Sequence, residues 1–173
     1  GLKTQTAGRI RKIKKYLKPN ETFFMTYGDG LSNVNLSKLL KCHKDNNRIA
    51  TVTAVRPMAR FGALNITNEK VTDFTEKPAN ESGWINGGFF VLSEKVINYI
   101  KSDDEAWESG PIKRLLTEDQ LSAYKHSGFW QPMDTLREKH ILTNLWKTGK
   151  APWKVELETI TKELPRNKLA LVK

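Results

Sequence analysis

Two aspartates stand where a strand-like segment gives way to a turn or a helix, and both could do chemistry. In "FFMTYGDGLS", Asp29 follows an apolar run and lies between Gly28 and Gly30, which let other atoms approach closely. In "FWQPMDT", Asp134 follows a second strand-like stretch and precedes a helix. Two carboxylates converging from distant loops could hold one Mg²⁺, which takes oxygen ligands from carboxylates, water and substrate phosphates. On spacing alone a simpler interpretation is stronger, because Asp-Gly is a common turn and Asp134 would help to cap the following helix.

Two further segments carry polar groups beside a strand. In "FTEKPAN", Lys77 could meet a phosphate as a point charge and Glu76 could accept hydrogen bonds from sugar hydroxyls. The alternative is an ordinary charged strand end. In "WINGGFF", Asn86 offers a donor and an acceptor, and the pair Gly87 and Gly88 indicates either close approach of a ligand or backbone, or a β-bulge.

The composition narrows the class of protein. The chain has 173 residues, a hydrophobic fraction of 38% and a formal net charge of +10, which suits one sizeable domain with anionic ligands. No apolar run approaches the ~18 residues of a membrane span, the first residues include no apolar export segment, and a single Cys42 fits a reducing compartment. We therefore expect a cytoplasmic protein. The three histidines lack metal-ligand spacing, and no P-loop is found.

Strands and helices are expected to alternate, which predicts an α/β layered domain. Asn35, Ser93 and Thr135 are expected to cap helices, and Pro111 to stand in the first turn of another. The predicted helices are 8–18, 36–47, 94–100, 111–119 and 136–149. The predicted strands are 22–26, 48–55, 84–92 and 121–126, with a hairpin of 62–66 and 70–77.

Taken in order, the motifs "TYGDG", "ARFGALN", "EKP", "WINGGFFVL" and "GFWQPMDT" resemble the sugar-1-phosphate nucleotidyltransferases, most closely their glucose-1-phosphate cytidylyltransferase branch, over about residues 1–153. With this resemblance, metal binding becomes the stronger interpretation of Asp29 and Asp134, ahead of a turn residue and a helix cap. It implies the family's Rossmann-like nucleotide-diphospho-sugar transferase fold, a mixed, mostly parallel sheet flanked by helices. It also implies Mg²⁺-dependent transfer of a cytidylyl group from CTP to glucose 1-phosphate, giving CDP-glucose and pyrophosphate. In bacteria that product feeds synthesis of the O-antigen of lipopolysaccharide.

The resemblance also implies roles for individual residues. Asp29 and Asp134 would be the Mg²⁺ ligands, and together with Lys77, which would contact the sugar phosphate, they would be the catalytic residues. The other substrate-binding residues would be Tyr27, Glu76, Asn86, Gly87 and Trp130 around glucose, and Thr4, Arg9 and Gly28 around CTP.

The chain departs from the family pattern in three places. No segment resembles the family's glycine-rich phosphate loop, so we expect an N-terminally incomplete fold whose exposed strand edge a second copy of the chain or the tail would cover. Gly110 stands where the family tends to carry an acidic residue, and residues 154–173 form a tail of unknown role.

Two other functions compete with an enzyme. A non-catalytic sugar-nucleotide-binding or assembly module is the main alternative, since it would keep the pocket and lose turnover. A basic nucleic-acid-binding domain is disfavoured, because the positive charges of residues 8–18 are not interleaved with stacking aromatics. Neither nucleic acid nor a membrane is an expected partner.

Overall fold

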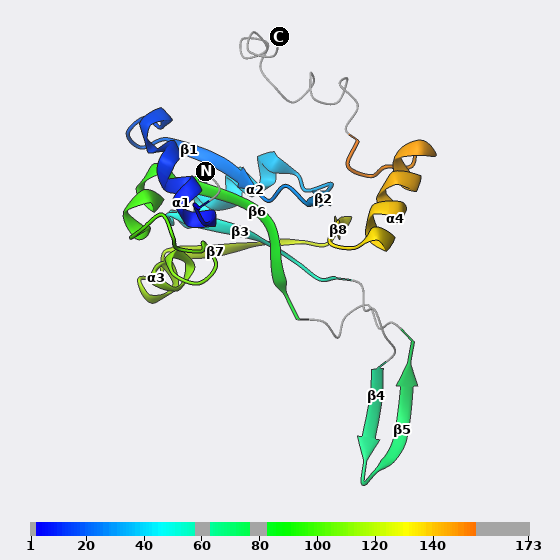
Figure 1. Ribbon diagram of the computed structural model, residues 1–173. Helices are drawn as coiled ribbons and strands as arrows, with labels where there is room; N and C mark the ends of the chain where they lie inside the picture. Colours follow the sequence, from blue (N-terminus) through cyan, green and yellow to red (C-terminus); the bar gives the residue numbers. More distant parts are fainter. Residues whose placement is uncertain (1–2, 58–62, 77–82, 155–173) are drawn as a thin grey trace.

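The computed structural model describes residues 3–57, 63–76 and 83–154, and its centre is a four-stranded sheet (Figure 1). The strand order is β1-β6-β3-β7. Strands β1, β3 and β7 run in one direction, and β6 runs against its neighbours β1 and β3. The expected mixed sheet of an α/β domain is therefore confirmed. The bounds are β1 Thr22–Thr26, β3 Ala50–Val55, β6 Ile85–Ser93 and β7 Leu121–His126.

Helices cover both faces of this sheet, because alternate strand residues point to opposite sides. On one face Ala50, Phe90 and Leu92 pack in the main core with Trp107 and Leu115. The elements on that face are α1 (Thr6–Lys12), the 3-10 helix η2 (Glu94–Tyr99) and α3 (Pro111–Thr117). The neighbouring residue Thr51 points the other way, where its hydroxyl meets His43 of α2 (Leu36–Asn46) at 2.9 Å.

A second, smaller pairing stands at the end of the sheet. Strand β2 (Gly30–Ser32) pairs antiparallel with β8 (Trp130–Pro132), and α4 (Leu136–Lys147) follows β8 directly. These two strands are short, and sequence patterns did not predict their pairing. Their position matters because β2 begins just after Asp29 and β8 ends just before Asp134.

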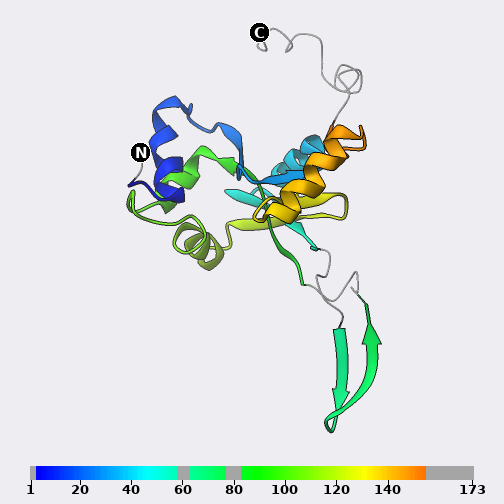
Figure 2. The same ribbon diagram turned by 45° about the vertical axis from the view of Figure 1, so that its right-hand side comes forward.

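The predicted hairpin is confirmed and extends away from the sheet (Figures 1 and 2). It consists of β4 (Ala63–Thr67) and β5 (Lys70–Thr75), joined by Asn68 and Glu69. Both connecting residues have positive φ, 48° and 64°. A two-residue hairpin turn needs such angles to match the right-handed twist of the strands that it joins.

Two predicted helices differ from the structure in type, and the other three end one or two residues earlier than predicted. The basic helix expected over 8–18 is α-helical only to Lys12 and continues as the 3-10 helix η1 (Ile13–Tyr16). The segment 8–18 contains no acidic residue, so its Arg and Lys side chains have no opposite charge one helical turn away, and like charges at that spacing weaken a longer α-helix. The segment after Ser93 is a 3-10 helix, and the β-branched Val96 and Ile97 at its centre fit poorly into an α-helix. None of the described helices is both long and apolar enough to cross a membrane.

Candidate functional site

The pairing of β2 with β8 brings Asp29 and Asp134 to one cavity. Gly30 lies opposite Pro132, and the Met133 N–H donates to the Asp29 carbonyl at 2.7 Å. Both aspartates line a cavity of about 190 Å³ at the end of the sheet. Residues far apart in the sequence are thus held in fixed relation by backbone hydrogen bonds rather than by their own side chains.

Neither aspartate serves as a helix cap. Asp29 does stand in the turn between β1 and β2, as the simpler interpretation expected. The cap of α4 is Thr135, whose side chain accepts from the Glu138 N–H, while the Glu138 carboxylate accepts from the Thr135 and Asp134 N–H groups at 3.0 Å. This capping box fixes the backbone of Asp134 and leaves its carboxylate for another use.

The two carboxylates suit a divalent cation. Within the described part of the chain, neither side chain has a hydrogen-bond or ion-pair partner, and both face the same cavity. The described residues contain no group of three or more His, Cys, Asp or Glu side chains able to hold a metal. Two carboxylates are nevertheless what Mg²⁺ typically takes from a protein when substrate phosphates and water complete its shell. The donor set therefore fits Mg²⁺ bound together with a phosphorylated substrate.

The glycine pair of β6 also lines this cavity. The register between β3 and β6 shifts at this point, so the predicted β-bulge is present. A Cβ on Gly87 would lie 2.8 Å from Val55, and one on Gly88 would lie 2.9 Å from the Tyr27 ring. Gly88 also has φ of +78°, which an L-residue rarely adopts. The glycines are thus required by close approach of protein groups on both sides.

Three side chains form hydrogen bonds around the pair Gly87 and Gly88. The Trp130 indole N–H donates to the Gly87 carbonyl at 2.8 Å, and the Gly88 N–H donates to Asn86 Oδ1 at 2.8 Å. Asn86 Nδ2 in turn donates to the Tyr27 hydroxyl at 3.1 Å. The predicted substrate residues Tyr27, Asn86, Gly87 and Trp130 all line the cavity that holds the two aspartates.

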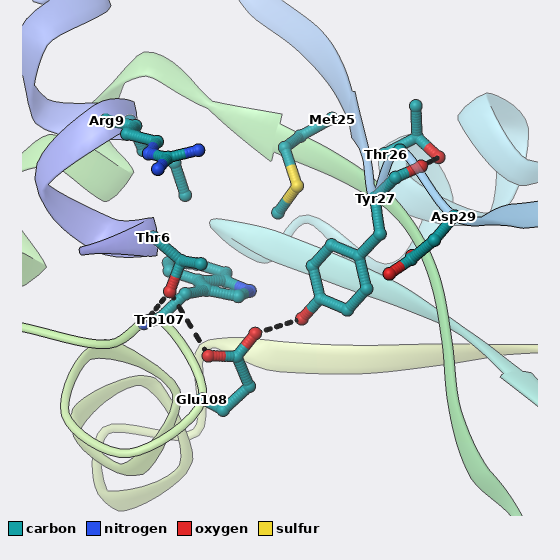
Figure 3. A pocket seen from close by; sticks show the side chains of 10 residues that line it. Thr6, Arg9, Met25, Thr26, Tyr27, Asp29, Trp107 and Glu108 are labelled. Atoms are coloured by element: carbon teal, nitrogen blue, oxygen red, sulfur yellow. Dashed lines mark hydrogen bonds between the residues drawn. The ribbon is translucent and has the colours of Figure 1, made fainter. Parts of the chain in front are cut away.

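A larger cavity of about 460 Å³ adjoins it (Figure 3). The predicted nucleotide-side residues Arg9 and Gly28 line it, and Tyr27 and Asp29 line both cavities. Thr4 is buried. Its carbonyl accepts from Arg9 Nε at 3.3 Å, and its hydroxyl accepts from Lys12 Nζ at 2.7 Å. Thr4 therefore holds two basic side chains in place and is not among the lining residues.

Sequence patterns missed several residues that line the larger cavity, among them Trp107 and Glu108. The Glu108 carboxylate accepts from the Tyr27 hydroxyl at 2.5 Å and from the Thr6 hydroxyl at 3.2 Å (Figure 3). Burial, followed by this bond to Glu108, raises the pKa of Tyr27 well above its ordinary value. Trp107 is fully buried, and within the described chain its indole N–H has no partner. No local signal points to Glu108, because its partners lie on distant elements.

The remaining predicted residues lie elsewhere or outside the described part. Lys77 falls outside the described residues. Glu76 directly follows β5 of the hairpin and is not among the residues that line either cavity. Gly110 stands against Glu105, because a Cβ there would lie 1.8 Å from Glu105 Oε1. Glu105 forms a 2.6 Å ion pair with Arg114, so an acidic side chain already occupies that space.

Comparison with known proteins shows the family and the fold of the chain. The chain is 46% identical over 154 residues to the glucose-1-phosphate cytidylyltransferase of Salmonella typhimurium, covering 89% of this chain and 60% of that enzyme. It is 31% identical over 142 residues to the glucose-1-phosphate adenylyltransferase of Acetivibrio thermocellus, covering 74% of this chain and 33% of that one. The chain thus spans about three fifths of the length of its cytidylyltransferase relative.

Solved structures show the same fold. HddC from Yersinia pseudotuberculosis superposes with a TM-score of 0.60 at 20% identity, over 83% of this chain and 63% of that one. The inositol-1-phosphate CTP transferase from T. maritima superposes with a TM-score of 0.58 at 12% identity, over 90% of this chain and 65% of that one. At these identities the likeness concerns the fold, and the fold implied by the sequence motifs is confirmed. The profile of the Nucleotidyl transferase family matches residues 1–167, nearly the whole chain, and the chain therefore belongs to that family.

Proposed function

We propose that this chain carries the sugar side and the metal site of a glucose-1-phosphate cytidylyltransferase. The complete reaction is transfer of a cytidylyl group from CTP to glucose 1-phosphate, giving CDP-glucose and pyrophosphate. The observation that carries the proposal is that Asp29 and Asp134 line one cavity with Tyr27, Asn86 and Trp130. The 46% identity to a glucose-1-phosphate cytidylyltransferase supports the choice of nucleotide and sugar.

In this reaction a phosphate oxygen of glucose 1-phosphate attacks the α-phosphorus of CTP in line, and pyrophosphate leaves. Such chemistry depends mainly on positioning and charge stabilisation, and the attacking oxygen is already ionised, so no general base is needed. Asp29 and Asp134 would hold Mg²⁺, which when bound neutralises charge that develops on the phosphates. Lys77 would hold the sugar phosphate.

The other side chains would bind and orient the substrates. Tyr27, Asn86, Gly87 and Trp130 would contact the sugar, with Glu76 reaching it from the hairpin. Arg9, held by Thr4 and standing near Gly28 in the larger cavity, would meet the phosphates of CTP as a fixed cation. The adjoining cavities share Tyr27 and Asp29, which fits two substrates that must meet at one phosphorus atom.

The alternative is a module that binds sugar nucleotides or supports assembly without turnover. The enzyme and the non-catalytic module need the same pocket, so a binding measurement does not distinguish them. A measurement of catalysis does. A cytoplasmic location, a role in lipopolysaccharide synthesis and assembly into a homo-oligomer are further parts of the proposal.

The experiment measures pyrophosphate release by the chain with CTP, glucose 1-phosphate and Mg²⁺, together with the melting temperature in the presence of CDP-glucose. Release with both substrates supports the enzyme. A raised melting temperature without release supports the non-catalytic module, because a ligand that binds only the folded state stabilises it. If the chain shows no pyrophosphate release and no rise in melting temperature, both functions are refuted.

Substitution at the aspartates tests the metal site. Asp134→Asn and Asp29→Asn are each expected to weaken Mg²⁺-dependent binding of CDP-glucose by at least about ten-fold while leaving the melting temperature of the free protein unchanged. Asp104→Asn is the matched control, because Asp104 is exposed and lines neither cavity. Equal Mg²⁺ dependence in all three variants would show that these carboxylates do not hold the metal.

A further inference from the structure

Two chains of hydrogen bonds converge on the carboxylate of Glu108. One begins at the backbone N–H of Gly88 and passes through Asn86 and the Tyr27 hydroxyl. The other begins at the backbone N–H of Trp107 and passes through the Thr6 hydroxyl, which accepts from that N–H at 2.8 Å. The two chains start from fixed backbone groups on different elements and end on the two oxygens of one side chain.

The direction of each bond follows from the groups involved. A backbone N–H can only donate, so Asn86 presents Oδ1 to Gly88 and must turn its NH₂ group towards Tyr27. The Tyr27 oxygen accepts there, and its own proton goes to Glu108, because an ionised carboxylate can only accept. Hydrogen bonds to a charged acceptor are about twice as strong as neutral ones, so the bond from Tyr27 to Glu108 is the strongest of this series of hydrogen bonds.

Glu108 and Asn86 belong to different cavities. Glu108 lines the larger cavity, and Asn86 lines the smaller one with the two aspartates. Of the residues in this chain of bonds, Tyr27 lines both cavities. The orientation of a polar group on the sugar side is therefore connected to a carboxylate on the nucleotide side.

We propose that Glu108 is a positioning residue, which acts through the Tyr27 hydroxyl to hold the Asn86 amide in the orientation that the ligand of the smaller cavity meets. The proposal rests on the proposed function for the identity of that ligand, a sugar nucleotide. With Gly88 and Tyr27 as partners, Asn86 keeps one amide hydrogen and one carbonyl lone pair for sugar hydroxyls. An amide oriented before binding loses less freedom when the ligand arrives, which favours affinity.

The chain offers a matched control for this arrangement. Tyr99 donates to Glu118 at 2.5 Å, the same kind of bond at the same distance as that between Tyr27 and Glu108. Neither Tyr99 nor Glu118 lines either of the two adjoining cavities. Glu118→Ala and Tyr99→Phe therefore remove the same chemistry at a place where it positions nothing in the site.

The first measurement follows the side-chain amide signals of Asn86 by NMR in the free, ¹⁵N-labelled chain. Asn86→Asp identifies these signals by removing them. Glu108→Ala, the more conservative Glu108→Gln and Tyr27→Phe are expected to shift them, and Glu118→Ala is expected to leave them in place. Unshifted Asn86 signals in a folded Glu108 variant would overturn the proposal, whether or not the protein binds any ligand.

The second measurement is the affinity for CDP-glucose with Mg²⁺. Glu108→Ala is expected to weaken binding about ten-fold in the wild-type background and less than about two-fold when Tyr27→Phe is already present, because the connection runs through that hydroxyl. A full ten-fold loss in both backgrounds would mean that Glu108 contacts the ligand directly, which contradicts a positioning role. A wild-type chain that binds no CDP-glucose would count against the proposed function, and the NMR result would still decide the role of Glu108.

Discussion

The contact between Gly88 and Tyr27 can be tested by adding a single methyl group. Gly88 has φ of +78°, and a Cβ at this position would lie 2.9 Å from Cδ2 of the Tyr27 ring and 3.3 Å from Cγ. Gly149 has a similar φ of +70°, with no atom within 4 Å of an added Cβ. Gly28 also has open space, and its φ lies outside the left-handed region. The three glycines therefore separate backbone strain from steric overlap.

The expected losses follow from these geometries. An L-residue in the left-handed region costs about 1–2 kcal/mol, and this cost applies to both Gly149→Ala and Gly88→Ala. Overpacking against the partly buried Tyr27 ring adds about 1–3 kcal/mol at Gly88 only. The free energy of unfolding should thus fall by about 2–5 kcal/mol in Gly88→Ala, by about 1–2 kcal/mol in Gly149→Ala and by very little in Gly28→Ala.

Urea unfolding of the wild type and the three Gly→Ala variants measures these differences. The slope of the unfolding free energy against urea concentration is compared between variants, so that a change in the unfolded state is detected. For a chain of this size each kcal/mol corresponds to about 2–4 °C in melting temperature, which gives an independent check. In the Tyr27→Ala background, Gly88→Ala should cost no more than Gly149→Ala. A loss in Gly88→Ala no larger than that in Gly149→Ala would refute the close approach of the Tyr27 ring to β6.

Two further predictions concern the elements that support the site. Removal of the cap in Thr135→Ala should lower the free energy of unfolding by about 1 kcal/mol, whereas Thr135→Ser should be nearly neutral, because serine caps equally well; equal urea midpoints for the two variants would contradict the capping box. Burial lowers the pKa of His43 in the folded state, so the unfolded chain binds a proton more readily and stability is lost as pH falls below about 6.5. The melting temperature should therefore fall less between pH 7.5 and pH 5 in His43→Gln than in wild type or in the exposed-site control His140→Gln, and an unchanged pH dependence would show that His43 does not titrate in this way.

The sequence by itself determined most of the local structure. Asn35, Thr135 and Pro111 marked helix starts, and the structure confirms all three, because caps and first-turn prolines act within one helical turn. The hairpin and its turn were likewise predicted from neighbouring residues. The ordered motifs also identified the family, which the profile match confirms.

Only the tertiary structure decided which side chains of the site lie close to one another. The pairing of β2 with β8, two strands too short to be recognised by pattern, brings Asp29 and Asp134 to one cavity. The order of the sheet and the path of the loop between η2 and α3 decide that Tyr27 meets Glu108. Helix and turn signals depend on residues a few positions apart, whereas these contacts join groups far apart in the chain, and only the packing of the whole sheet with its covering helices sets their distances.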